Sequence, residues 1–73
     1  MEKYLKSIPE TERGRPLPFI APSGQRYLVT RHIQKRLFYL WRVTEEDAMK
    51  LAEDSDQYNL FKTMSEMNAK GVL

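Results

Sequence analysis

The chain has 73 residues, of which 41% are hydrophobic and 30% charged, and its formal net charge is +2. This length suits one small domain with a modest core. The chain has no cysteine, which excludes a disulfide framework and a thiolate zinc site, and its single histidine excludes a metal site built on imidazole pairs. We therefore expect no metal or other cofactor.

The start of the chain lacks the apolar core of a signal peptide, and no apolar run approaches the roughly 18 residues of a membrane span. These patterns predict a soluble cytoplasmic protein without a membrane partner.

Charge is distributed very unevenly along the chain. Between Glu12 and Glu45 there are 32 consecutive residues without an acid. Residues 1–42 hold nine lysines and arginines against three acids, whereas residues 43–73 hold three against seven. A basic, aromatic-rich stretch of this kind is typical of a nucleic-acid-binding surface.

Residues 1–18 contain three of the four prolines. This spacing leaves little room for regular secondary structure. We expect a flexible basic arm over residues 1–18, followed by a single small domain over residues 19–73.

The clearest local signal is the turn Ala21-Pro22-Ser23-Gly24-Gln25. Proline presets the backbone at the second turn position, and glycine accepts the positive φ that follows. The segment therefore predicts a hairpin connection.

Residues 19–20, 27–29 and 37–43 have strand character, because they are rich in β-branched and aromatic side chains. With a loop at 34–36 that places Ile33 opposite Leu37, one face would carry Tyr27, Val29, Ile33, Leu37, Tyr39, Trp41 and Val43. The other face would carry Arg26, Leu28, Thr30, His32, Phe38, Leu40 and Arg42. A helical stripe also fits residues 28–41, so an all-α bundle is the alternative fold.

After Val43 the composition changes, and Thr44-Glu45-Glu46-Asp47 resembles a helix start with acids at the positive end of the helix dipole. Ser55 or Asp56 could cap a second helix that ends near Gly71. We therefore predict an α+β fold, a three-stranded antiparallel meander backed by one or two C-terminal helices.

The sequence offers no enzyme signature: it has no cysteine nucleophile, no phosphate-binding glycine-rich loop, and no evident serine or aspartate partner for His32. Lysine and arginine instead supply the phosphate contacts that dominate nucleic-acid affinity. The candidate nucleic-acid-binding residues are Arg13, Arg15, Arg26, Arg31, Lys35, Arg36 and Arg42. Among the aromatic residues, Trp41 is expected in the core, and Phe38 is the candidate for base stacking.

Arg13-Gly14-Arg15-Pro16 resembles the four-residue core of the AT-hook. In AT-hooks the two arginines lie along the minor groove of A·T-rich DNA. Glu12 before the core and Leu17-Pro18 after it depart from the basic flanks usual in that family.

Three short strands followed by Thr44-Glu45-Glu46-Asp47-Ala48 and a helix resemble the DNA-binding modules of plant ethylene-response factors and the arm-binding domains of phage tyrosine integrases. The resemblance spans residues 18–54. It implies that the sheet enters the major groove and that the helix backs it.

The sequence thus predicts a non-catalytic DNA-binding protein with an accessory or regulatory role, of the kind carried by phages and plasmids; DNA is favoured over RNA, and a homodimer is compatible with its size. The alternative is an interaction or inhibitor protein with a macromolecular partner. Its anchor would be the helical stripe Tyr58, Phe61, Met64 and Met67.

Overall fold

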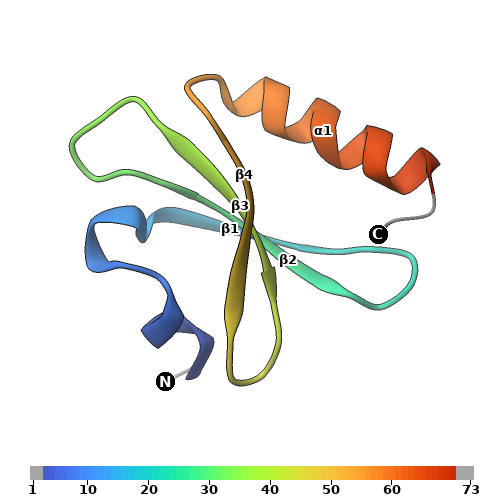
Figure 1. Ribbon diagram of the computed structural model, residues 1–73, viewed down its shortest axis with the longest axis horizontal. Helices are drawn as coiled ribbons and strands as arrows, with labels where there is room; N and C mark the ends of the chain where they lie inside the picture. Colours follow the sequence, from blue (N-terminus) through green and yellow to red (C-terminus); the bar gives the residue numbers. More distant parts are fainter. Residues whose placement is uncertain (1–2, 71–73) are drawn as a thin grey trace.

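Four antiparallel strands and a C-terminal helix form the protein (Figure 1). The structure is a computed structural model that describes residues 3–70, apart from the side chain of Asn68. The strands follow one another across the sheet in the order β1-β2-β3-β4. The elements are η1 Lys3–Ser7, η2 Glu10–Glu12, β1 Gly14–Ile20, β2 Arg26–Arg31, β3 Phe38–Val43, β4 Ala48–Asp54 and α1 Gln57–Ala69. The predicted α+β class is confirmed, with four strands instead of three, and the all-α alternative is wrong.

The hairpin between β1 and β2 forms at the predicted turn. The Gly24 N–H donates to the Ala21 carbonyl at 2.8 Å, and the Ala21 N–H donates to the Gln25 carbonyl at 2.9 Å. Gly24 has φ +90°. This is a three-residue loop with proline at its first position and glycine at the left-handed position, so local sequence chemistry accounts for it.

Residues 25–43 contain two strands, as predicted, but their register differs from the predicted one. Arg31 pairs with Phe38, so the connecting loop runs from 32 to 37. His32 organises this loop. Its side-chain Nδ1 accepts the backbone N–H groups of Gln34 and Lys35, both at 3.1 Å. Its backbone N–H donates to the Leu37 carbonyl at 2.8 Å.

The register change reverses the predicted faces of β2 relative to β3. A shift of one residue moves every side chain of a strand to the opposite face. Tyr27 and Val29 therefore share a face with Leu40, whereas Leu28 lies on the same side as Trp41. The prediction that Tyr27 and Val29 lie beside Tyr39, Trp41 and Val43 was wrong.

Residues 44–54 form a turn and strand β4 instead of the predicted helix. Thr44 Oγ1 accepts the Asp47 N–H at 3.1 Å, as a helix cap would, but the Thr44 N–H donates to the Asp47 carbonyl at 2.8 Å and the chain reverses. The next seven residues form β4, and six of them pair with residues of β3. Strand pairing satisfies the backbone N–H and C=O groups of both β3 and β4. A short helix with few apolar residues would be only marginally stable and would leave these groups of β3 unpaired.

A bulge in β4 explains why this segment resembles a helix in sequence. Leu40 pairs with Ala52 and Trp41 with Lys50, so Leu51 is the extra residue. Leu51 and Ala52 consequently pack on the same cluster, whereas Ala48 packs on the other face of the sheet. With the extra residue, Ala48, Leu51 and Ala52 have the i, i+3, i+4 spacing that usually indicates a helix.

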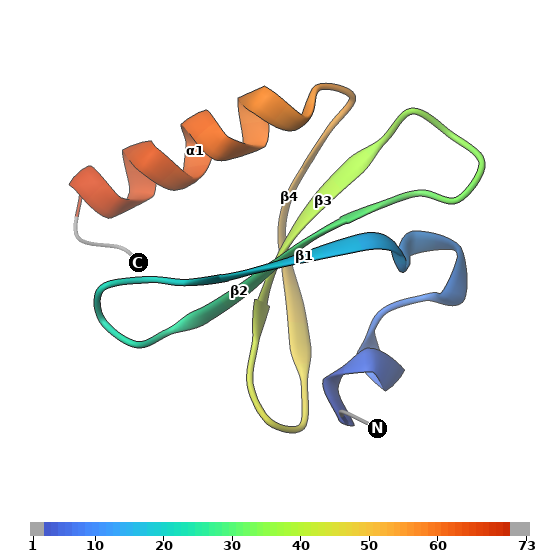
Figure 2. The ribbon, with the colours of Figure 1, turned by 180° about the vertical axis from the view of Figure 1, so that it is seen from behind.

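Both faces of the sheet are covered, as the two opposite views show (Figures 1 and 2). Helix α1 covers one face, where a cluster of buried side chains comprises Tyr27, Val29, Leu40 and Leu60. The N-terminal segment covers the other face, where the buried cluster comprises Tyr4, Ile8, Leu28, Tyr39, Trp41 and Val43. The hydrophobic core is therefore divided into two layers by the sheet.

The N-terminal residues differ from the arm that the prolines predicted. Ile8 is fully buried and Ser7 Oγ donates to Asp47 Oδ1 at 2.6 Å, so residues 3–8 pack against the sheet and the 44–47 turn. This bond and one from the Ala48 N–H lower the pKa of the Asp47 carboxyl. Pro16 and Pro18 lie in β1, which is an edge strand and tolerates residues without an N–H.

Asp56 is the N-cap of α1, in agreement with one of the two predicted caps. Its Oδ1 accepts the Tyr58 N–H at 2.9 Å. Asp54 Oδ1 in turn accepts the Asp56 N–H at 2.9 Å, which ties the helix start to the end of β4. The predicted helix end at Gly71 lies outside the described residues.

Candidate nucleic-acid interface

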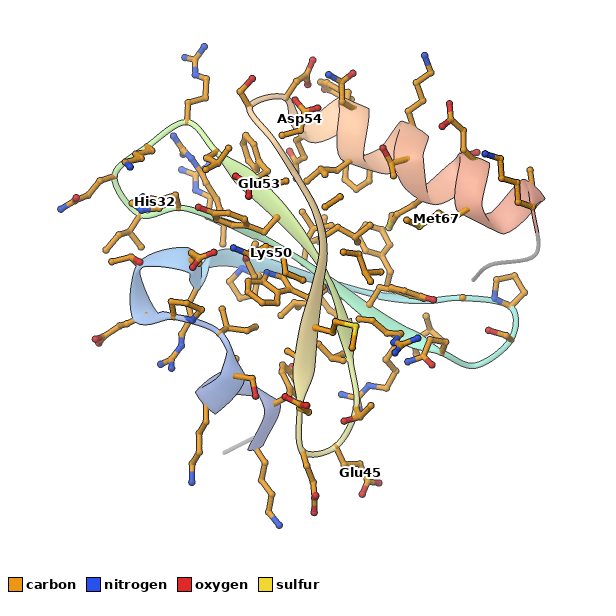
Figure 3. All side chains as sticks on the ribbon, in the orientation of Figure 1. His32, Glu45, Lys50, Glu53, Asp54 and Met67 are labelled. Carbon is orange, nitrogen blue, oxygen red and sulfur yellow. The ribbon has the colours of Figure 1, made fainter. Side chains whose placement is uncertain are left out.

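Strand pairing mixes the basic and acidic halves of the sequence in space. Phe38 and Tyr39 of β3 pair with Asp54 and Glu53 of β4, so acids of the second half lie next to a strand of the first. Figure 3 shows Glu53 and Asp54 along β4 on the way to the helix. The charge asymmetry of the sequence is therefore not an asymmetry between two halves of the molecule.

Five of the seven candidate basic residues nevertheless come from segments that meet at one end of the sheet. Gly14, between two of them, pairs with Arg31, and the Ile33 N–H donates to the Thr11 carbonyl at 2.9 Å. The 32–37 loop and the start of β1 consequently lie side by side (Figure 2). We call this region the basic end; it comprises Arg13, Arg15, Arg31, Lys35 and Arg36.

The other two candidates, Arg26 and Arg42, lie at the opposite end of β2 and β3. Arg26 pairs with Val43, and Arg42 pairs with Tyr27, so the two side chains lie on opposite faces of the sheet. The Arg26 guanidinium carbon lies 5.8 Å from the centre of the Tyr4 ring. The structure therefore does not bring these two arginines together with the basic end.

The basic end has no acidic partner at ion-pair distance within residues 3–70. The ion pairs in that range are Lys3–Glu46 and Lys50–Glu12, and neither involves a candidate residue. Arg13 Nε donates to the Ile8 carbonyl at 2.8 Å, which anchors its side chain without neutralising it. The positive charges of the basic end are thus available to an anionic partner.

The arginine–glycine–arginine sequence at residues 13–15 has a structural role in the sheet. A Cβ atom on Gly14 would lie 2.7 Å from the Arg31 carbonyl oxygen, so only glycine allows this approach of β1 to β2. Arg15 has φ 46° at the irregular pairing that follows. The segment that resembles an AT-hook core is therefore part of an edge strand.

An open groove of about 520 Å³ lies between the 32–37 loop and the start of α1. We call it the arginine groove; its lining residues are Arg31, Arg36, Phe38, Ser55, Asp56, Gln57 and Tyr58. The Arg31 guanidinium carbon lies 5.8 Å from the centre of the Phe38 ring. Tyr58 is 79% exposed, which makes its ring accessible from solvent.

Arg31 contains a buried donor without a partner. Its Nε is inaccessible to solvent and makes no hydrogen bond to any described residue. An unsatisfied buried donor costs about 1–3 kcal/mol. This donor stays unsatisfied by the described residues.

Lys50 forms a second polar cluster, which sequence reasoning missed. Its Nζ pairs with Glu12 and lies 4.5 Å from the centre of the Tyr39 ring and 5.3 Å from that of the Trp41 ring. Figure 3 shows Lys50 near the middle of the sheet. Burial raises the pKa of Tyr39, and the nearby Glu12 carboxylate adds to the effect, so the phenol remains protonated at neutral pH. This cluster links η2 to β4 and has a structural role.

The alternative anchor stripe on α1 is divided between core and surface. Phe61 and Met64 pack against the buried cluster under the helix, and the Phe61 ring meets the Phe19 ring edge-to-face at 5.5 Å. Tyr58 is exposed at the first turn of the helix. Met67, labelled in Figure 3, lies farther along the helix and is partly buried. The four side chains therefore do not form one exposed surface.

Within residues 3–70, no helix is long and apolar enough to cross a membrane. The same part of the chain contains no group of three or more histidine, cysteine or acidic side chains arranged to hold a metal ion.

In comparisons with known proteins, no protein-family model, no curated protein and no solved structure matches the chain.

Proposed function

We propose that this protein binds DNA without catalysis, through the basic end. The observation that carries the proposal is that three adjacent chain segments carry five basic residues, none of which has an acidic partner within the described residues. Such an arrangement supplies phosphate contacts and releases counterions from DNA.

The covered faces of the sheet favour loop contacts over entry of the sheet into a groove. The modules of ethylene-response factors and phage integrases use an open sheet face, whereas here α1 and the N-terminal segment lie on the two faces. The 32–37 loop and the start of β1 carry four exposed basic residues, and DNA would contact this end of the sheet. Arg26 and Arg42, at the other end, are outside the proposed interface.

The setting that we propose is an accessory or regulatory role in the cytoplasm. A basic end on a small sheet holds a position on DNA but offers no reacting group, so the protein would act by occupying or presenting DNA.

The dependence of binding on salt tests this proposal. If about five basic side chains meet phosphates, the logarithm of the association constant should fall with the logarithm of salt at a slope of roughly −4 to −5 on duplex DNA. Replacing Lys35 and Arg36 with alanine should reduce the size of that slope by up to about 2 units, because each lost contact releases one counterion fewer. Fluorescence anisotropy at several salt concentrations measures both slopes.

Arg26→Ala combined with Arg42→Ala is the matched control, because it removes the same charge from the opposite end of the sheet. Its slope should remain closer to that of the unmodified protein. Equal slopes for both double variants, or no binding at low salt, would contradict the proposal.

An interaction or inhibitor protein is the second candidate, and one observation favours it. An apolar groove of about 230 Å³ runs between the β1–β2 hairpin and α1, with Phe19, Ile20, Phe61 and Met64 among its lining residues. Ile20 is 75% exposed at this groove. A partner side chain, or a second copy of the chain, could pack there.

A further inference from the structure

We propose that the arginine groove binds one unpaired nucleotide, with its base on Tyr58 and Phe38 and its phosphate on Arg31 and Arg36. This inference rests on the proposed DNA-binding function and names the form of nucleic acid that the same end of the molecule prefers. The shared chemistry is an unpaired base with its phosphate, which single-stranded DNA and single-stranded RNA both present.

The aromatic side chains of the groove supply the first argument. Tyr58 is 79% exposed and lines the groove with two arginines. Phe38 is partly buried against the cluster under α1 and lines the same groove, with the Arg31 guanidinium near its ring. An exposed ring combined with arginines is typical of single-strand-binding surfaces, where bases stack and the backbone follows the positive charge. In a duplex the bases are stacked on one another and cannot reach these rings.

Arg31 and Arg36 supply the second argument, since they approach the groove from different segments. Arg31 ends β2, and Arg36 belongs to the 32–37 loop. Arg31 is partly exposed and Arg36 exposed, and neither has an acidic partner at ion-pair distance within residues 3–70, so both guanidinium groups can donate to a phosphate oxygen. Two guanidinium groups can thus hold one phosphate.

Asp56 determines how the nucleotide would lie. Asp56 lines the groove at the start of α1, and its Oδ1 accepts the Tyr58 N–H. It repels phosphate from the helix end, so the phosphate is placed toward Arg36 and the base toward Tyr58. Asp56 and Gln57 then offer an acceptor and an amide to the polar edge of the base.

Anisotropy measurements with three labelled probes of one sequence test the inference: a DNA strand, the RNA strand and the DNA duplex. A length of about 15 nucleotides covers the site of one small domain. The unmodified protein should bind a single strand more tightly than the duplex. Tyr58→Ala should weaken single-strand binding roughly tenfold, because it removes one stacking platform, and should change duplex binding by less than about twofold. Tyr58→Phe, which keeps the ring, should retain single-strand affinity.

Met49→Ala is the matched control, because it shortens another exposed side chain, in a strand outside the groove. Unequal affinity for the two single strands would identify DNA or RNA as the source of the nucleotide and support the inference. Equal binding of strand and duplex, or unchanged single-strand binding by Tyr58→Ala, would overturn the inference. The proposed function would survive either of these two results if the Lys35 and Arg36 double variant still reduced the size of the salt slope on duplex DNA. Absence of binding to all three probes would overturn both.

Discussion

Trp41→Ala is expected to abolish the cooperative folding of this domain. Trp41 is 3% exposed in the cluster under the N-terminal segment, and its Nε1 donates to Thr30 Oγ1 at 2.8 Å. Truncation of a buried tryptophan costs about 3–5 kcal/mol, and the Thr30 hydroxyl, itself 1% exposed, would lose its donor. A domain of this size has a net stability of only roughly 3–5 kcal/mol, so the loss is comparable to the whole.

Circular dichroism during thermal and urea unfolding measures the effect without depending on the tryptophan signal. Met49→Ala serves as the control, since Met49 is 54% exposed and surface changes usually alter stability by less than about 0.5 kcal/mol. A Trp41→Ala protein with an unchanged unfolding midpoint would show that this layer of the core does not stabilise the fold.

Phe61→Asp should likewise remove the cooperative melting transition, because it disrupts the layer of the core between the sheet and α1. Phe61 packs against the cluster of Tyr27, Val29, Leu40 and Leu60 and meets Phe19 edge-to-face. An aspartate at this position would lie among apolar side chains without a partner, and a charge in that setting is strongly destabilising. Thermal unfolding followed by circular dichroism, together with sedimentation to report mass, checks the result.

Tyr58→Asp is the matched control, because it places the same carboxylate on the same helix at an exposed position. It should melt cooperatively. A folded Phe61→Asp protein that had lost an association present in the unmodified protein would instead support the partner-binding candidate, with Phe61 as its anchor.

Local chemistry in the sequence predicted the parts of the fold that depend on neighbouring residues. The turn at residues 21–25 needs only proline and glycine at two positions, and the cap of α1 needs only Asp56. The turn formed as predicted, and the cap is one of the two predicted residues, Ser55 or Asp56. The strand character of 37–43 was also correct, because aromatic and β-branched side chains favour a pleated surface whichever face they occupy.

Features that depend on distant residues could not be read from the sequence. The register of β2 against β3 depends on how His32 closes the following loop, and an error of one residue reversed the faces. Strand β4 forms because β3 offers an edge with which it can pair. The bulge at Leu51 gives its apolar residues the spacing of a helix, so the sequence predicted a helix there. The prolines before residue 19 predicted an arm, but two of them, Pro16 and Pro18, lie in β1, an edge strand that accommodates them.

The candidate site was predictable in residue type but not in arrangement. Charge alone selected the arginines and lysine, yet it could not separate Arg26 and Arg42 from the basic end, because strand pairing decides which of them meet. Phe38 was selected as a stacking residue, and it lines the arginine groove. Tyr58 was assigned to a partner-binding stripe, since only the return of the chain through β4 brings the start of α1 to the basic loop.

The most direct test of DNA binding through the basic end is a heteronuclear NMR titration of the isotope-labelled protein with a short DNA strand at low salt. We expect shift changes at the amides of Arg13, Arg15, Arg31, Lys35 and Arg36, and little change at Arg26 and Arg42, at the other end of β2 and β3. Shift changes confined to that other end, or a spectrum that DNA does not alter, would contradict the account.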